Sequence, residues 1–385
     1  KGFIALFKFK IVIKYIIYWF INLSIKPSKE IQKNSLLLIR IDAIGDYILF
    51  RNFIEILKNS KKFKAYKITL LGNLAWKNLS LELDSEYIDQ FIWLDRDKFT
   101  SDLIYRHKKL KEFTAQGYEI ILSPTYSREF FYADTIVKHV TAIEKIGSRS
   151  DISNLNVWQK NNSDKYYTKL ISAKKEIMFE FNRNKEFFET LIEENINTLK
   201  PKIYLKEKKL SFNLPQNYAI FFVGAGKNFR KWDIQKFAVV AKHLKDNYDY
   251  KIVLCGGAND IKESKSFKQF FNGKYLDLVD KTTLIELLYV INKGNILISN
   301  ETVAPHIAIA LDMKDVFVIH NGLNLGRFAP YPKNLNQNYH IICHPEIKKN
   351  LGDFAKLCNK YRFESDLNIN EISEDNVIEK LDKAL

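Results

Sequence analysis

One segment of the chain joins a buried strand, a polar turn and an apolar helix: NILISNETVAPHIAIAL, residues 295–311. Its aliphatic run predicts a short buried strand, and the polar turn after it carries Asn300, Glu301 and Thr302. In an open α/β sheet, ligands bind beyond the carboxyl ends of the strands, where free N–H groups at helix starts favour anions. The segment therefore predicts an α/β fold with a ligand at one edge of a parallel sheet.

Two side chains near this turn could contact such a ligand. Glu301 would repel a phosphate, so its carboxylate is expected to accept hydrogen bonds from ribose hydroxyls or to lie opposite the phosphate. His306 follows near the same helix start. A capped helix with a structural histidine explains this segment, taken alone, equally well.

A second strand-to-helix turn has the same character. The apolar run 218–223 predicts a strand, and Gly224 and Gly226 follow it, before the basic stretch 227–231. Glycines let backbone N–H groups approach a ligand closely, and the basic side chains supply positive charge. The spacing fits neither a Walker loop nor G-x-G-x-x-G, because Phe229 stands where the third glycine would be. A further predicted strand also ends in two glycines, so the pattern suits a nucleotide diphosphate across a sheet edge.

The N-terminal half contains a third version of this pattern. Residues 36–41 predict a buried strand, and Gly45 and Asp46 precede a helical pattern from 47 to 58. An aspartate there could be an ordinary helix N-cap, which stabilises a helix by about 1 kcal/mol. It could instead face a cleft and act as a general base.

Taken together, these segments resemble the bacterial heptosyltransferases of glycosyltransferase family nine, which transfer heptose from ADP-heptose to lipopolysaccharide core or to proteins. The resemblance covers about residues 35–335, in the order of the family. Its motifs are LIRIDAIGD at 38–46, RKW at 230–232, LVDKTTL at 278–284 and SNETVAPH at 299–306.

The resemblance implies a GT-B fold, with two Rossmann-like domains whose parallel sheets face a cleft. It also implies inverting sugar transfer with Asp46 as the base, without a metal or another cofactor. Lys231 would contact the diphosphate, Thr302 would lie on the phosphate side, and His306 would also contact the donor. The expected donor site comprises Gly224, Gly226, Lys231, Glu301, Thr302 and His306.

Three positions depart from the family pattern. Glu301 and Val303 stand where the family usually has aspartate and glycine, and Asp280 replaces another usual glycine. The longer carboxylate shifts its oxygens by about one C–C bond, and Val303 removes the conformational freedom of glycine near the phosphates. These departures bear on the choice of donor more than on the fold.

The pattern along the chain predicts three regions. Strand runs alternate with helical patterns, as in parallel α/β sheets, and 385 residues suffice for two cores. We expect a basic membrane-surface segment at 1–30, an acceptor domain at 31–210 and a donor domain at 211–385. The polar stretch 151–185 predicts an irregular connection. Three cysteines without C-x-x-C spacing indicate neither a disulfide framework nor a metal site, and they fit a reducing cytoplasm.

The net charge of +15 includes five lysines and no acid in residues 1–26. The longest uncharged run there, Tyr15 to Ile25, is shorter than the roughly 18 residues that span a bilayer. The segment therefore predicts a helix lying on an anionic membrane, at the inner face of the cytoplasmic membrane. A signal peptide would need a small-residue cleavage site, whereas packing against the N-terminal domain stays open. No nucleic-acid motif is present, so nucleic acid is not an expected partner.

The sequence thus predicts a cytoplasmic, peripheral-membrane glycosyltransferase. Its donor would be ADP-heptose or a related nucleotide sugar. Its acceptor would be a lipopolysaccharide or lipooligosaccharide core, or another glycan or lipid-linked acceptor. Two alternatives remain at this stage, namely a GT-B sugar-nucleotide epimerase and a catalytically inactive membrane-surface protein of the same fold. Neither the base of the nucleotide nor the acceptor can be identified from these motifs.

Overall fold

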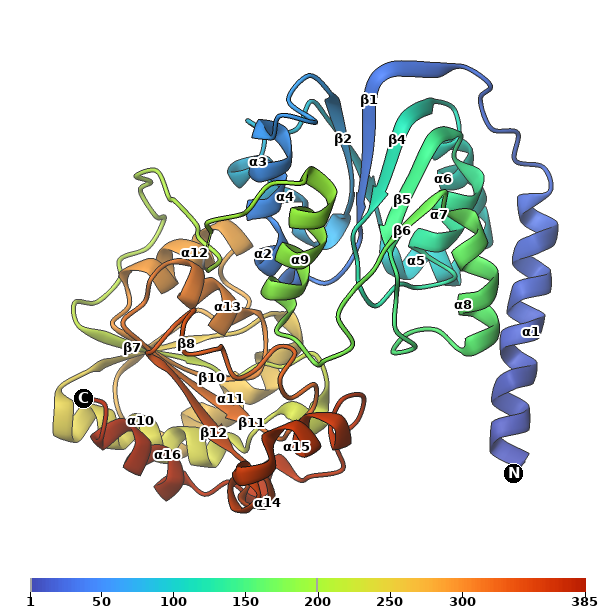
Figure 1. The fold of residues 1–385 in the computed structure, drawn as a ribbon. Helices are drawn as coiled ribbons and strands as arrows, with labels where there is room; N and C mark the ends of the chain where they lie inside the picture. Colours follow the sequence, from blue (N-terminus) through green and yellow to red (C-terminus); the bar gives the residue numbers. More distant parts are fainter. Residues whose placement is uncertain (1, 199) are drawn as a thin grey trace.

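The computed structural model describes the backbone of residues 2–198 and 200–385, and the side chains of residues 12–198 and 200–385. It contains two six-stranded sheets, each with all neighbouring strands parallel (Figure 1). Counted from the N-terminal end of each domain, both sheets have the strand order 3-2-1-4-5-6 of a doubly wound fold. The predicted fold of two Rossmann-like domains is confirmed.

The N-terminal domain is built around the first sheet, with helices on both faces (Figure 1). Its strands are β1 (Ile31–Arg40), β2 (Lys67–Asn73), β3 (Gln90–Leu94), β4 (Gly117–Ser123), β5 (Ala142–Ser148) and β6 (Lys169–Ile171). Its helices are α2 (Ile44–Phe50), α3 (Asn52–Asn59), α4 (Lys77–Leu83), α5 (Arg96–Ser101), α6 (Leu103–Phe113), α7 (Ala133–His139), α8 (Val157–Ser163) and α9 (Glu180–Ile192).

The C-terminal domain repeats this arrangement. Its strands are β7 (Tyr218–Phe222), β8 (Lys251–Cys255), β9 (Tyr275–Asp277), β10 (Ile296–Asn300), β11 (Asp315–His320) and β12 (Tyr339–Cys343). Its helices are α10 (Ile234–Tyr248), α11 (Ile261–Phe270), α12 (Leu284–Lys293), α13 (Val303–Ala310), α14 (Pro345–Lys349), α15 (Phe354–Lys360) and α16 (Glu374–Asp382).

The central strands are buried on both faces because helices cover both sides of each sheet. In β1, Leu36 to Ile39 are at most 1% exposed, and in β10 the run Ile296–Ile298 is equally buried. A strand in this position needs an uninterrupted apolar run rather than alternation. Both runs end where the strand order of their sheet reverses, so the turns that follow them lie at the two ligand-binding crevices.

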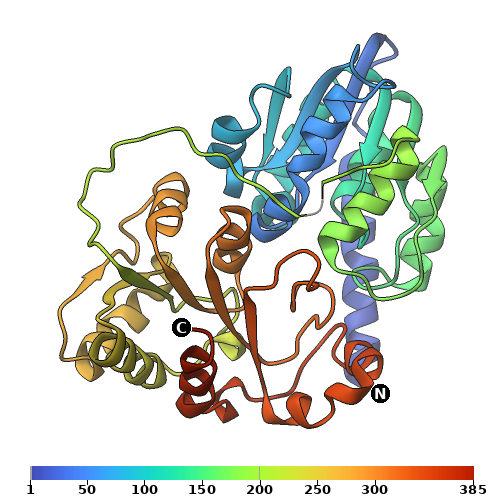
Figure 2. The same ribbon diagram turned by 60° about the vertical axis from the view of Figure 1, so that its left-hand side comes forward.

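A long connection leads from one domain to the other. Residues 200–217 contain no helix or strand and run as an extended loop outside the two sheets (Figure 2). The domain boundary predicted after residue 210 falls in this loop. Before it, α9 packs against α2 and α3 of the N-terminal domain.

The prediction of an irregular connection over residues 151–185 is wrong for much of that stretch. It contains α8, strand β6 and the start of α9. Asn156 caps α8 by accepting a hydrogen bond from the backbone N–H of Gln159, whose side chain bonds back to Asn156 in a capping box. Strand β6 is only three residues long, but it pairs with β5 and completes the sheet.

An N-terminal helix, α1 (Gly2–Asn22), packs on the N-terminal domain beside α6 (Figure 1). Tyr18 faces inward and donates a hydrogen bond to the carbonyl of Thr100 at 2.7 Å. The outward side of the helix is apolar and exposed, at Val12, Ile13, Ile16, Ile17, Phe20 and, beyond its end, Leu23. The side chains of Lys1, Lys8 and Lys10 lie outside the described residues. Among the helices described, none is long and apolar enough to cross a membrane.

The structure explains one departure from the family pattern. Asp280 has φ of +58°, in the left-handed region that glycine adopts without strain. Its side chain is exposed, and aspartate is one of the few other residues that tolerate this conformation. The replacement of a glycine at this position therefore preserves the turn before α12.

Candidate active site

A cavity of about 620 Å³ opens between the two domains, where the turns after β1 and β10 and the turn after β7 converge. The N-terminal domain contributes Asp42, Gly45, Asp46, Asn73, Arg96, Thr125 and Glu129 to its lining. The C-terminal domain contributes Gly226, Arg230, Glu301, Thr302, Val303, His306, Asn324, Arg327 and Phe328. Of the predicted site residues, the cavity brings together Asp46, Gly226, Glu301, Thr302 and His306.

Asp46 lies in the first turn of α2, facing this cavity. The N-cap of α2 is Ala43, and no side chain caps the helix. The alternative in which Asp46 is an ordinary N-cap is therefore wrong. Its carboxylate is available to a ligand in the cleft.

The surroundings of Asp46 favour proton uptake near neutral pH. Burial raises the pKa of Asp46 to about 7, and the carboxylates of Asp42 and Glu180 act in the same direction. The guanidinium groups of Arg40 and Arg327 oppose that increase. A general base works best when its pKa lies near the operating pH, so the pKa of Asp46 suits it to accept a proton.

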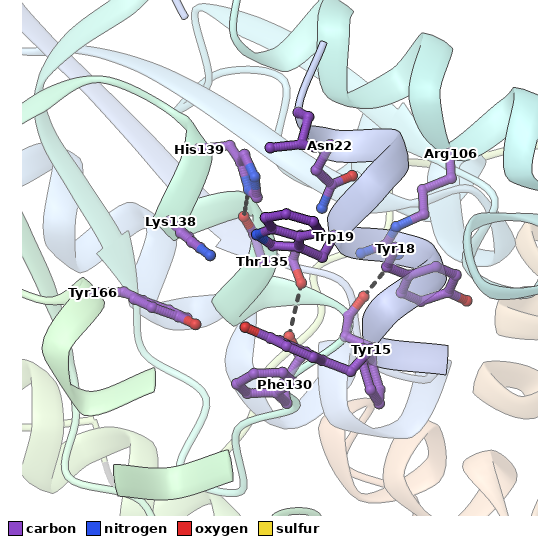
Figure 3. Close-up of a pocket in the computed structure, with 12 residues that line it drawn as sticks. Tyr15, Tyr18, Trp19, Asn22, Arg106, Phe130, Thr135, Lys138, His139 and Tyr166 are labelled. Atoms are coloured by element: carbon purple, nitrogen blue, oxygen red, sulfur yellow. Dashed lines mark hydrogen bonds between the residues drawn. The ribbon is translucent and has the colours of Figure 1, made fainter. Parts of the chain in front are cut away.

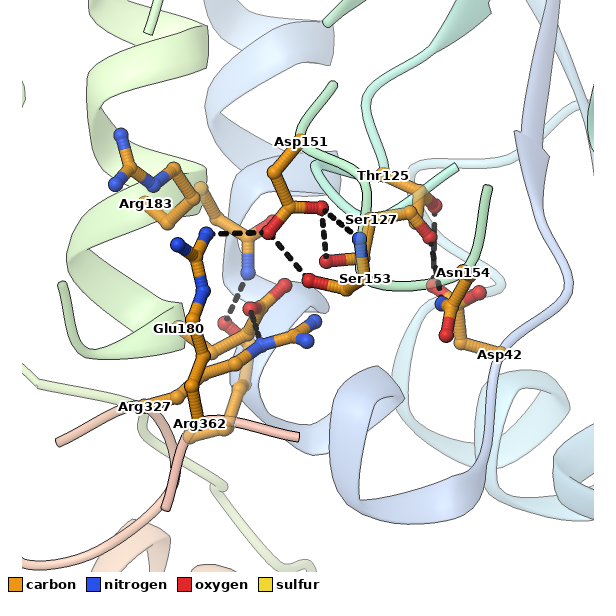
Figure 4. A network of polar contacts seen from close by, with 12 residues as sticks. Asp42, Thr125, Ser127, Asp151, Ser153, Asn154, Glu180, Arg183, Arg327 and Arg362 are labelled. Atoms are coloured by element: carbon orange, nitrogen blue, oxygen red, sulfur yellow. Dashed lines mark hydrogen bonds and ion pairs between the residues drawn. The ribbon is translucent and has the colours of Figure 1, made fainter. Parts of the chain in front are cut away.

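Several buried charges lie near Asp46, and Figure 4 shows part of this network, with Glu180 beside Arg327. Nε of Arg40 lies 2.8 Å from Oδ2 of Asp42, and Nη2 of Arg40 lies 3.7 Å from Oε1 of Glu180. The other oxygen of Glu180 is 3.0 Å from Nε of Arg327, which comes from the C-terminal domain. Glu180 is thus a bridge between the domains as well as a charge near Asp46.

These residues differ in how clearly the sequence alone indicates them. Arg40 ends a buried apolar strand, and a charge there requires buried partners. Glu180 and Arg327 lie in segments without a recognisable motif, and only the fold brings them to Asp46.

The two predicted glycines have different surroundings. A Cβ on Gly226 would meet nothing within 4 Å, and this glycine borders the cavity. A Cβ on Gly224 would come 2.0 Å from Oδ2 of Asp260, so this glycine makes room for a carboxylate of its own domain. Gly224 is not among the residues that line the cavity.

Lys231 also lies outside the cavity lining. Its ammonium is 2.9 Å from Oδ1 of Asp260 and 2.9 Å from Oε1 of Glu263. Burial lowers the pKa of Lys231, but the hydrogen bonds to Glu263 and Asp260 outweigh burial and raise the pKa overall. Its neighbour Arg230 lines the cavity instead. The motif alone predicted no separate role for Arg230.

Arg230 and Glu301 form an ion pair at the edge of the cavity. Nη2 of Arg230 also donates to the backbone carbonyl of Glu301 at 2.7 Å. The longer carboxylate at position 301 thereby joins the turn before α13 to the basic turn after β7. Thr302 is the N-cap of α13 but makes no side-chain cap bond, and Thr302 and Val303 at the helix start both line the cavity.

Asn300 fixes these two turns to each other, a role that the motif alone did not reveal. Its Nδ2 donates to the carbonyl of Val223 at 2.8 Å, and its Oδ1 accepts from the backbone N–H of Trp232 at 3.0 Å. Asn300 is fully buried. It holds the turns after β7 and β10 in register and is not part of the cavity lining.

His306 is a neutral imidazole in this setting. It is 5% exposed, and burial, together with the nearby charge of Arg230, lowers its pKa to about 3. Its Nδ1 lies 2.8 Å from the hydroxyl of Tyr331. A ligand in the cavity would therefore meet His306 as a neutral hydrogen-bonding or packing group, not as a cation.

Two doubly wound domains with a polar cleft between their sheets define the GT-B fold. Similar solved structures are a family 9 glycosyltransferase from Veillonella parvula (17% identity, TM-score 0.69) and E. coli heptosyltransferase WaaC with ADP (13%, 0.66). A third is E. coli ADP-heptose lps heptosyltransferase II (14%, 0.62). The matches cover 93%, 91% and 91% of this chain and 98%, 100% and 98% of the other chains. At these identities the likeness shows the fold.

The sequence itself identifies the family. The chain belongs to glycosyltransferase family 9, the heptosyltransferases, whose sequence model matches residues 106–352. It is an enzyme of the glycosyltransferase class. No curated protein sequence matches the chain. Within the described residues, no three His, Cys, Asp or Glu side chains are grouped so that they could hold a metal ion.

Proposed function

We propose that this glycosyltransferase transfers a heptose or a related sugar, with inversion, from ADP-heptose or a similar nucleotide sugar. The acceptor is a lipopolysaccharide or lipooligosaccharide core, or another glycan or lipid-linked acceptor. Family membership supports the proposal, as do two similar structures described as WaaC with ADP and WaaC with ADP-2-deoxy-2-fluoro heptose. The main observation behind it is Asp46, a carboxylate with its pKa near 7 that faces the donor-side turns across one cavity.

The proposed mechanism assigns the base to the N-terminal domain. The acceptor hydroxyl lies beside Asp46, whose carboxylate takes the proton while the oxygen attacks the anomeric carbon. Attack comes from the face opposite the nucleotide, so the bond from the anomeric carbon to the diphosphate breaks with inversion. The leaving group carries away the electron pair as a nucleoside diphosphate.

The C-terminal domain stabilises that leaving group. The guanidinium of Arg230 and the N–H groups at the start of α13, near Thr302, supply positive potential where negative charge grows. Glu301 accepts hydrogen bonds from ribose or sugar hydroxyls while Arg230 holds it in place. Gly226 leaves space for the diphosphate, and neutral His306 contacts the donor beside Asp46.

A nucleotide panel and product analysis test this function. ADP at 100 times its dissociation constant should stabilise the protein by about 2.7 kcal/mol, seen as a higher melting temperature than with UDP, GDP or CDP. With ADP-heptose and a core acceptor, mass spectrometry should detect the transferred sugar. An epimerised sugar nucleotide without transfer, or no product at all, would contradict the proposal.

A matched pair of variants tests the donor side. Arg230→Gln should weaken ADP binding by about 10- to 100-fold, since a hydrogen bond to a charged group contributes roughly 1.5–3 kcal/mol. AMP, which lacks the second phosphate, should lose less. Lys231→Gln should have a smaller effect on ADP, because Lys231 must leave Asp260 and Glu263 before it can reach the diphosphate. Calorimetric titration measures the affinity of each variant for ADP and for AMP. A larger loss of ADP affinity in Lys231→Gln than in Arg230→Gln would assign the diphosphate contact to Lys231 instead of Arg230.

Membrane location is part of the same proposal. Residues 1–26 hold the enzyme on the inner face of the cytoplasmic membrane, where a lipid-linked acceptor is found. The exposed apolar side of α1 and the lysines of this segment support it. The buried side of α1 packs against α6, so the segment serves the fold as well.

A further inference from the structure

A second pocket, which shares no lining residue with the cleft, lies between α1 and the N-terminal domain (Figure 3). Its volume is about 170 Å³, enough for a phosphate group and the atoms next to it. Helix α1 and the residue after it contribute Tyr15, Tyr18, Trp19, Asn22 and Leu23, and the domain contributes Arg106, Phe130, Phe131, Thr135, Lys138, His139 and Tyr166. None of these residues takes part in the proposed transfer reaction.

The charge of this pocket has one sign. Arg106 and Lys138 line the pocket. Lys14 lies near Arg106: burial lowers the pKa of Lys14, and the positive charge of Arg106 lowers it further. The described residues that line the pocket include no carboxylate, and none of the three cations forms an ion pair in the described part of the chain. An anion in this pocket would meet several positive charges and no repulsion.

Arg106 is the strongest indication of a ligand. It is fully buried, and its Nε and Nη2 have no hydrogen-bond partner among the residues whose side chains the structure describes. Only Nη1 is bonded, to the carbonyls of Phe99 at 3.1 Å and Phe131 at 3.0 Å. Figure 3 shows the guanidinium extending from α6 toward α1, where it lies 3.8 Å from the ring centre of Tyr18. A buried cation without a counter-ion is costly, and an anion beside it offsets that cost.

The walls of the pocket are aromatic. Tyr15, Trp19, Phe130 and Tyr166 line it, and Nζ of Lys138 lies 5.3 Å from the ring centre of Tyr166. Tryptophan and tyrosine are enriched where a protein meets the headgroup level of a membrane, because one end of each ring system is apolar and the other polar. Trp19 remains 45% exposed and lies on α1 together with the exposed apolar residues Ile16 and Phe20. The pocket therefore opens beside the very surface proposed to contact the bilayer.

We propose that this pocket binds the phosphate of an anionic membrane lipid. The phosphate lies against Arg106 and Lys138, and the glycerol and first chain carbons contact the aromatic side chains. The inference rests on the proposed membrane location of the enzyme and is independent of the chemistry in the cleft. It gives α1 a specific contact with single lipid molecules, in addition to nonspecific adsorption.

The test uses the full chain and monomeric short-chain lipids, so that no charged bilayer surface is present. Dihexanoylphosphatidylglycerol, below its critical micelle concentration, should bind with one site per chain in calorimetric titration. Inorganic phosphate should bind at least about tenfold more weakly, because it lacks the groups that contact the aromatic walls. Equal affinity for inorganic phosphate and the lipid would show a free-anion site and overturn the proposal.

Two lysine variants separate the pocket from surface charge. Lys138→Gln should weaken lipid binding about fivefold, since one lysine near an anionic lipid contributes roughly 1 kcal/mol. Lys108→Gln removes the same charge at an exposed position on α6 outside the pocket, and should leave the affinity unchanged. Both lysines are exposed, so both variants should fold. Equal losses in the two variants would contradict a site in the pocket.

The lipid pocket and the nucleotide cleft can be tested separately in the same samples. Titration with ADP reports the cleft, and titration with the lipid reports the pocket. Wild-type protein that binds ADP but not the lipid overturns the lipid site alone. Protein that binds the lipid but no nucleotide overturns the donor assignment and supports the lipid site.

Discussion

Replacement of Asp46 by asparagine should lower the rate of sugar transfer by about 10²- to 10⁴-fold, the usual contribution of a general base. The amide has nearly the same size but cannot take the proton of the acceptor hydroxyl. ADP binding should persist, because the donor-side turns belong to the other domain and do not include this residue. Initial rates of transfer and a parallel ADP titration measure the two effects separately.

The pH dependence gives this prediction a second readout. Because the pKa of Asp46 is raised to about 7, kcat/KM of the wild-type enzyme should fall as the pH drops below about 7. Above that pH the carboxylate is ionised and the rate should level off. Asp46→Asn should lose this acid limb, whereas Asp246→Asn, at the exposed end of a surface pair with Lys242, should keep it. Near-normal turnover of Asp46→Asn would remove the residue from the mechanism.

The second large effect concerns stability. Glu180→Gln should reduce the free energy of unfolding by about 3–5 kcal/mol, the usual cost of removing one partner from a buried ion pair. Glu180 is 1% exposed and lies between Arg40 and Arg327, so its neutralisation leaves two guanidinium groups poorly compensated. Urea unfolding of wild type and variant measures the difference. Because Arg327 comes from the other domain, the loss should include contacts between the domains.

The control for this prediction lies at the end of the same helix. Glu193 is 75% exposed on its side chain and lies 3.3 Å from Lys62, so Glu193→Gln should change stability by less than about 1 kcal/mol. Glu180→Gln should also shift the acid limb of transfer to lower pH, because a like charge that raises the pKa of Asp46 has been removed. An unchanged acid limb together with full stability would show that Glu180 is not part of this network.

The predictable parts of the fold are those that depend on residues close together in the sequence. A parallel strand buried on both faces requires a continuous apolar run, and residues 36–41 and 295–299 have one. The polar and glycine-containing turns after these strands lie at the crevices because strand order places them there. The residues alone place Gly226 and Thr302 in such turns, whereas the assignment of Asp46 to the same cleft came from the resemblance to family nine.

Other features depend on contacts between distant segments. Lys231 forms ion pairs with Asp260 and Glu263, which lie beyond α10 and β8 in the chain, and no motif indicates that pairing. Glu180 likewise reaches Arg327 only when the two domains meet. The capping box of Asn156 was a local signal in a polar stretch, so α8 could have been predicted from the spacing of Asn156 and Gln159.

The contact between Gly45 and His306 has a mechanical consequence. A Cβ on Gly45 would come 3.2 Å from Cδ2 of His306, so the two residues meet almost without clearance. His306 cannot easily retreat, because it is buried and bonded to Tyr331. Any side chain at position 45 would therefore push α2 away from α13. Glycine at this position lets the turn that carries Asp46 pack directly on a helix of the other domain, and so sets how closely the two walls of the cleft approach each other.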